Sequence, residues 1–329
     1  MKKSGILCLL FLLVGSRAQA FDLLARKPDN RDTSFIAIHR LPINFRLYGV
    51  TKFMELNLRG QEDSIPSARY NPHEKIGIGI GSYYRSIGFF LGLHTFGKSK
   101  NKDQYRLDLQ LNQFGKKFSN DFYLQRYQGL YLENTDVFKR YLNSLPGSYR
   151  NDVITNCYGA NTNYYFNWKK FSIRAAFIQS EHQKKDAGSW SIGGGYSGVS
   201  FRADSSLIPL DEKSAITIGV KAGKASLIGL NGGYSYIWVW KKYAYASISL
   251  SGGTGIAYWR YTNENNTHFQ GIHPLLRMAA RASVGYNANK YFFGLNAIFD
   301  QFTILDNSNT PSYSLGNIRA FIGYRIGRQ

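Results

Sequence analysis

Six histidines are the side chains in this sequence best suited to acid–base chemistry near neutral pH. They are His39, His73, His94, His182, His268 and His273. One cluster is worth naming: His182 stands beside the carboxylate of Glu181, with hydroxyl groups nearby at Ser180 and Ser189. The chain contains no G-x-S-x-G nucleophile elbow and no H-E-x-x-H zinc motif. The sequence therefore predicts no catalytic residue.

The charged stretch around His182 has a simpler interpretation. Glu181, Lys184 and Lys185 fall between two apolar runs and are expected to form a solvated external-loop cluster. No spacing of His, Cys, Asp and Glu matches a metal site, and no glycine-rich loop is placed to bind phosphate. We therefore expect neither a metal nor a cofactor.

A second group of charged residues alternates with apolar residues along extended runs. Its members are Arg106, Asp108, Asp121, Arg174, Arg277, Arg281, Asp300 and Arg319. If these runs cross a membrane as the strands of a barrel, a charge on the side that faces lipid costs about 2–4 kcal/mol at the midplane. These side chains are therefore expected to line the interior of the barrel, its lumen. Either the opposite charges pair and fill a sealed lumen, or the excess of arginine lines a water path that favours anions.

The elements that must position these residues are strands, because large apolar residues recur at every second position. Fourteen such runs are predicted, at residues 43–58, 75–84, 87–95, 105–112, 118–132, 156–166, 171–180, 189–201, 213–222, 226–240, 243–258, 274–286, 291–304 and 315–326. Alternating segments of about ten residues, separated by turns, are typical of a transmembrane antiparallel up-and-down β-barrel. The run at 213–222 is the weakest, and if it is a folded loop the even number expected of such barrels becomes twelve.

The connections alternate in length, which orients the predicted barrel. Tight turns at 85–86, 115–117, 167–170, 241–242 and 287–290 fall on one side, and the long connections 60–74, 133–155 and 259–273 fall on the other. Short periplasmic turns and long external loops would place both chain ends in the periplasm. Val137, Phe138 and Tyr141 have helical spacing, so a short helix is predicted in one external loop.

The first twenty residues predict export. Residues 1–20 have two lysines, an apolar run and the ending Ala18-Gln19-Ala20, as in a cleaved signal peptide. Residues 21–42 are expected either to plug the lumen or to lie in the periplasm, and residues 43–329 to form the barrel domain. Cleavage removes Cys8 and leaves Cys157 alone, so no internal disulfide can form.

Composition excludes two further classes of protein. The mean hydropathy is −0.31 and aromatic residues make up 16% of the chain, which does not suit a helical membrane protein. A net charge of +20 often indicates nucleic-acid binding, but export removes that partner and no nucleic-acid motif is present. Anionic lipid phosphates are the counter-charge that we expect.

Several stretches resemble a family of uncharacterised Gram-negative outer-membrane proteins grouped as domain of unknown function 4421. The similar stretches are 171–177, Gln179, Glu181, 183–185, 187–189, 32–33, 46–48, 107–134, 204–209 and 233–236. The similarity extends over nearly the whole mature chain, with departures at Trp168 and His182. The resemblance implies an outer-membrane β-barrel and supplies no activity, ligand or catalytic residue.

Together these observations predict a monomeric barrel in the outer membrane, inserted by the barrel-assembly machinery and in contact with outer-membrane lipids and lipopolysaccharide. The most concrete function is a passive, anion-preferring pore. The alternative is a structural or lipopolysaccharide-contacting surface barrel with a sealed lumen. A lipid-modifying outer-membrane enzyme is kept as the last-ranked alternative.

Overall fold

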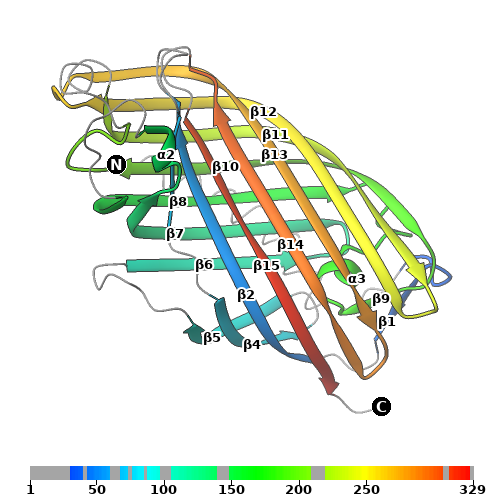
Figure 1. Ribbon diagram of the computed structural model, residues 1–329. Helices are drawn as coiled ribbons and strands as arrows, with labels where there is room; N and C mark the ends of the chain where they lie inside the picture. Colours follow the sequence, from blue (N-terminus) through cyan, green and yellow to red (C-terminus); the bar gives the residue numbers. More distant parts are fainter. Residues whose placement is uncertain are drawn as a thin grey trace.

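The strands form a closed antiparallel wall in the computed structural model (Figure 1). The structure describes residues 30–39, 43–59, 67–72, 76–84, 87–96, 105–138, 148–208, 219–306 and 311–326. The first part of the wall contains β2 (Ile43–Leu58), β3 (Ala68–Asn71), β4 (Ile76–Tyr84), β5 (Ile87–Phe96), β6 (Tyr105–Phe114), β7 (Phe118–Leu132) and β8 (Tyr149–Tyr165). The second part contains β10 (Ala187–Arg202), β11 (Val220–Trp240), β12 (Ala244–Asn263), β13 (His268–Asn287), β14 (Tyr291–Ile304) and β15 (Pro311–Ile326).

Between β2 and β7 the wall is completed by two separate sets of strands, one at each end of the barrel. From β7 the sheet continues through β8 and β10 to β15, which pairs with β2 along its whole length. The short strand β3 then bridges β2 and β7 at one end and completes a ring of ten strands. At the other end β4, β5 and β6 bridge the same two strands as additional members of the sheet.

The strand positions follow the period-two pattern, and most of the predicted runs are strands. On β12 the exposed side chains of Ile248, Leu250 and Ile256 share one face, while the alternate residues Tyr245, Ala257 and Trp259 are buried. Exposed apolar residues on the outer face and packed residues on the inner face are the alternation that a barrel wall requires.

The prediction of a strand at 171–180 is wrong. These residues form the helix α3 (Ile173–Phe177), which is followed by β9 (Glu181–Gln183) inside the barrel. The alternation misled because Ala176 and Ile178, which the pattern places on a polar face, are also fully buried. The side chain of Ser172 accepts a hydrogen bond from the Ala175 amide, and this cap favours a helical turn over an extended chain.

The described part of the chain contributes thirteen strands to the wall, against fourteen predicted, and one cause is that the run 171–180 lies in the interior. Most of the predicted run 213–222 lies outside the described residues, and Val220 already belongs to β11. The predicted long connection 259–273 is shorter than expected, because β12 and β13 continue to Asn263 and from His268. In the predicted loop helix, α2 spans Thr135–Phe138, and residues 139–147 lie outside the described part.

Two ends of the barrel can be distinguished by their connections. The short-turn end carries the tight turns at 115–117, 241–243 and 288–290, together with the end of β15. The loop end carries the connections after β7 and β10. The turn predicted at 85–86 and the signal peptide predicted at 1–20 lie outside the described residues.

Candidate functional site in the barrel interior

A folded segment occupies the interior at the short-turn end. We call residues 167–186 the plug, and Figure 1 shows its elements α3 and β9 near the C-terminal end of β15. Strand β1 (Ile36–Ile38) pairs with β9, so the chain that precedes the barrel contributes to this structure. Residues 31–38, from the segment expected to be either plug or periplasmic arm, therefore lie against the plug.

A buried carboxylate organises the plug. Glu181 is 2% exposed and accepts hydrogen bonds from Arg31 at 2.6 Å, Ser172 at 2.6 Å and Arg174 at 3.1 Å. Burial alone would raise the pKa of this carboxyl, but Arg174 and Arg31 and the hydrogen bonds from Arg31 and Ser172 lower it to about 2. The Glu181 side chain is therefore ionised and joins the N-terminal segment to α3 and β9.

This arrangement corrects two expectations for the charged residues of this stretch. Glu181, Lys184 and Lys185 do not form a solvated external cluster, because Glu181 is buried and Lys184 donates to the Thr33 carbonyl at 2.8 Å. Arg174 lies on α3 and not on a wall strand, and its Nε donates to the wall carbonyl of Phe114 at 2.7 Å. The sequence pattern could not show that this segment folds inward.

Two buried arginines on the wall hold the C-terminal end of α3. Arg46 on β2 donates to the Ile178 carbonyl at 2.7 Å, and Arg325 on β15 donates to the Gln179 carbonyl. Their positive charges face the end of a helical turn, where carbonyl groups lack partners within the helix. Gln179 has a φ of 50°, a left-handed conformation that ends the helix and turns the chain toward β9.

Asparagine side chains of the wall add contacts to the plug backbone. Asn296 on β14 donates to the Phe177 carbonyl at 3.1 Å, and Asn287 on β13 donates to the Glu181 carbonyl at 2.8 Å. The wall therefore satisfies polar backbone groups that would otherwise be buried without partners. The alternation in the sequence already places Arg325 and Asn296 on the inward face, and Arg46 could have been found in the same way. Nothing in the sequence indicated what these residues bind.

Ion pairs fill the middle of the barrel. Arg277 binds Asp300 through Nε at 3.0 Å and Nη2 at 2.5 Å, and its Nη1 donates to Asn161 on β8 at 2.6 Å. Arg281 pairs with Asp121. All four charged side chains are at most 14% exposed, so each charge has a partner in a region largely removed from water.

A second ionic group lies where β6 approaches β2. Asp108 is 3.0 Å from Lys52 and 3.8 Å from Arg106, and it accepts a hydrogen bond from Tyr127 at 2.9 Å. Lys52 was not among the predicted lumen residues, although it lies an even number of residues after Arg46 on β2 and therefore points inward as Arg46 does. The remaining predicted residue, Arg319, lies with its guanidinium 5.2 Å from the centre of the Tyr48 ring.

Apolar side chains close the loop end of the interior. Leu207 and Ile208, from the connection after β10, are at most 1% exposed and pack with Met54, Leu56 and Phe138. The Tyr70 hydroxyl donates to the Leu207 carbonyl at 2.7 Å and fixes this connection. A cavity beside Arg277 has a volume of only about 10 Å³, which is the lower limit for a single water molecule.

The residues around His182, which were considered for catalysis, make contacts that stabilise the fold. His182 lies on β9, with its ring centre 6.2 Å from that of His39 and 5.5 Å from that of Tyr243. The neighbouring Glu181 is occupied by the two arginines, and Ser189 accepts a hydrogen bond from the Asn167 amide at 2.9 Å. Within the described residues, no group of three His, Cys, Asp or Glu side chains could hold a metal ion.

Comparison with known proteins places the chain in a family. Residues 30–326 match the profile described as Domain of unknown function (DUF4421). No curated protein matches the sequence. None of the helices in the described part of the chain is long and apolar enough to span a membrane.

Three solved structures have an overall likeness to this chain. The outer membrane protease OmpT from Escherichia coli is 8% identical, with a TM-score of 0.36 over 86% of this chain and 96% of that chain. The toluene transporter TodX from Pseudomonas putida is 8% identical, with a TM-score of 0.29 over 87% and 90%. The outer membrane protein OprG from Pseudomonas aeruginosa is 10% identical, with a TM-score of 0.26 over 90% and 100%. Similarity at this level says nothing about what the present chain binds or catalyses.

Proposed function

Since this chain belongs to the DUF4421 family, we propose that it is an outer-membrane β-barrel with a sealed lumen, which acts through its surfaces and not as an open pore. The observation that carries this proposal is the pairing of the interior charges. Arg277 and Arg281 are each held by a carboxylate, and Glu181 ties the plug together. Guanidinium groups committed to such partners are not available to attract anions to a water path.

The outer face supports insertion in a membrane. From Ala246 to Tyr258 the outward positions of β12 carry no charge. This stretch rises about 40 Å at about 3.3 Å a residue, which is about 28 Å along the normal for a strand tilted about 45° and close to the hydrocarbon thickness of about 30 Å. The band ends in exposed aromatic residues, with Trp190, Trp238 and Trp240 toward the short-turn end and Tyr158 and Tyr258 toward the loop end.

The interior favours the sealed alternative over the anion-preferring pore. A pore of that kind needs a continuous water path lined by unpaired arginines. The plug, the ion-pair layer and the apolar loop-end layer follow one another along the barrel axis; the charged side chains of Arg277, Asp300, Arg281 and Asp121 are at most 14% exposed, and the other two layers contain fully buried apolar side chains. Three successive packed layers support the absence of a solute path.

Cell fractionation and planar-bilayer recording test the proposal together. The full-length precursor is expressed in a Gram-negative host, and the mature protein is then purified from the outer membrane and reconstituted. We expect heat-modifiable gel migration and protease protection of the strands, which show insertion, without stepwise conductance at any salt concentration. Stepwise conductance from inserted protein would reject the sealed lumen. A periplasmic, soluble product would reject the membrane assignment itself.

A further inference from the structure

A row of polar and basic side chains crosses the outer face of the barrel near its loop end. It consists of Arg126 on β7, Asn156 on β8, Ser200 on β10, Lys224 on β11, Arg260 on β12 and Gln270 on β13, and we call it the basic row. Each residue is the direct cross-strand partner of the next. The row shares its phase with the exposed residues Leu124, Ile228 and Ile256, so it faces outward.

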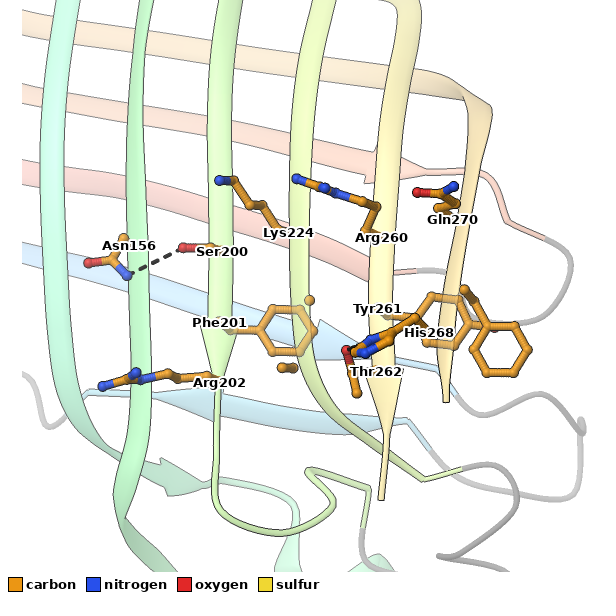
Figure 2. A pocket seen from close by; sticks show the side chains of 13 residues that line it. Asn156, Ser200, Phe201, Arg202, Lys224, Arg260, Tyr261, Thr262, His268 and Gln270 are labelled. Atoms are coloured by element: carbon orange, nitrogen blue, oxygen red, sulfur yellow. Dashed lines mark hydrogen bonds between the residues drawn. The ribbon is translucent and has the colours of Figure 1, made fainter. Parts of the chain in front are cut away.

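The row borders a hollow of about 480 Å³ (Figure 2). Figure 2 shows Lys224, Arg260 and Gln270 at one level on neighbouring strands, with Arg202 and His268 closer to the strand ends. Thr262 and His268 are hydrogen-bonded at 3.0 Å, and Asn156 donates to Ser200 at 3.3 Å. The hollow therefore presents cations beside amide, hydroxyl and imidazole groups.

Unlike Arg277 and Arg281 in the interior, the basic side chains of the row and the hollow have no carboxylate partner among the described residues. Among the residues that the structure describes, no carboxylate lies within ion-pair distance of Arg126, Arg202, Lys224 or Arg260. Arg260 lies 5.4 Å from the centre of the Tyr258 ring, and the Tyr258 hydroxyl donates to Gln270 at 2.8 Å. A cluster of unpaired cations on an exposed wall indicates an anionic partner from outside the chain.

The position of the row indicates which partner. The next outward side chains, two residues along each strand toward the middle of the barrel, are Leu124, Tyr158, Tyr258 and Ile272. Of these, Ile272 is 71% exposed. The row thus lies where the apolar band ends, at the depth of lipid head groups. Long basic side chains at this depth reach lipid phosphates with their charged ends while their stems stay in apolar surroundings.

The distance between the basic residues of the row indicates which kind of phosphorylated lipid fits it. Lys224 and Arg260 are neighbours, whereas Arg126 lies three strands from Lys224, about 14 Å away at about 4.8 Å a strand. Asn156 and Ser200 stand between these two basic points and offer hydrogen bonds. One phosphate cannot reach both points, but a sugar head group with a phosphate at each end can.

We propose that the basic row binds the diphosphorylated sugar head group of the outer-leaflet glycolipid, the lipid A part of lipopolysaccharide. One phosphate lies at Lys224 and Arg260, the other lies at Arg126, and the sugar hydroxyls contact Asn156 and Ser200. The inference rests on the proposed function, because it requires the loop end to face the outer leaflet. It adds to that function a specific lipid site on the wall.

Native mass spectrometry of the detergent-solubilised barrel can count bound lipids and give their affinity. The lipids are diphosphoryl lipid A, monophosphoryl lipid A and phosphatidylglycerol, each at the same low salt concentration. The variants are Lys224→Gln with Arg260→Gln, Arg126→Gln alone, and the conservative pair Lys224→Arg with Arg260→Lys. The matched control is Lys241→Gln with Lys242→Gln, two exposed lysines on a turn at the opposite end.

We expect diphosphoryl lipid A to bind the unmodified protein best. The pair Lys224→Gln with Arg260→Gln should weaken this binding about tenfold or more, because it removes both positive charges that hold one phosphate. Arg126→Gln should remove the preference for diphosphoryl over monophosphoryl lipid A. The conservative pair and the control pair should retain binding, and all variants should keep heat-modifiable migration.

Three results would overturn the site. Equal binding of phosphatidylglycerol, lost equally in the Gln pair, would mean that any lipid phosphate is accepted. Equal affinity for both forms of lipid A would reject the two-phosphate arrangement. Absence of lipid A binding by a barrel that inserts into bilayers would reject the site and leave the sealed barrel intact, whereas failure to insert would reject the proposed function.

Discussion

Arg281 on β13 forms an ion pair with Asp121 on β7, a strand that is not its neighbour in the sheet and that faces it across the interior. Asp121 also accepts a hydrogen bond from Asn112 at 2.6 Å. An ion pair across the lumen therefore links the two sides of the wall, in addition to the backbone hydrogen bonds between neighbouring strands. Removing either partner would leave the other buried and unpaired.

Asp121→Asn should therefore destabilise the barrel by about 3–5 kcal/mol, because the uncompensated Arg281 stays in a region removed from water. Urea unfolding in detergent, followed by circular dichroism, measures the change. The double variant Arg281→Met with Asp121→Leu should recover a large part of the loss, since apolar replacements leave no unpaired charge. Arg126→Gln, an exposed cation on the same strand as Asp121, is the control and should change stability by less than about 0.5 kcal/mol.

Glu181 should make the stability of the plug depend on pH. Its pKa is about 2 in the folded chain, against 4.5 for a glutamate free of these contacts, so its contribution is complete above about pH 4.5. The contribution is lost as the pH falls toward 2, because the unfolded chain then binds a proton that the folded chain does not. The difference in unfolding free energy between the natural protein and Glu181→Gln should be on the order of 3 kcal/mol at pH 6 and decline toward pH 2.

Glu133→Gln supplies the control for this pH series, because Glu133 is exposed at the loop end. It should give an unfolding profile parallel to that of the natural protein. A difference for Glu181→Gln that stays constant from pH 6 to pH 2 would show that Glu181 is not held as an ion.

Cys157 is a natural probe of the sealed lumen. It lies on the inner face of β8, is 0% exposed, and packs in the loop-end apolar cluster. A water-soluble maleimide should therefore fail to label the folded barrel and should label it fully after denaturation. In a Cys157→Ala background, Ser205→Cys on the exposed loop after β10 should react rapidly. Rapid labelling of Cys157 in the folded protein would reveal a water path through the interior.

The lysines at the short-turn end should assist insertion. They are Lys116, Lys117, Lys169, Lys170, Lys241 and Lys242, and Lys117 lies 4.5 Å from the centre of the Trp168 ring. Each is expected to contribute about 1 kcal/mol near an anionic surface. Replacing all six by Gln should slow folding into anionic vesicles and leave folding into neutral vesicles unchanged. Similar rates of the variant and the natural protein in anionic vesicles would show that these lysines serve only as polar turn residues.

The strand pattern was readable in the sequence because burial in a barrel wall is local. Each wall residue faces either the outside or the interior according to its parity, so β2, β7 and β14 begin and end where alternation predicts. The inward phase of Arg277, Arg281 and Asp300 could be predicted for the same reason. The family resemblance was also visible in the sequence, and the match over residues 30–326 confirms it.

Only the tertiary structure decided what the interior charges do. Parity places Arg281 and Asp121 inside, but it does not show which strands face each other across the lumen, because that depends on how the wall closes. Parity failed at residues 171–180, since a segment buried on every side has no exposed face for the pattern to record. The sequence by itself determined a barrel with a charged interior. Closure of the wall brings residues distant in the sequence together, as it does Glu181 and its two arginines, and only this tertiary arrangement shows that the charges pair and that the interior is packed.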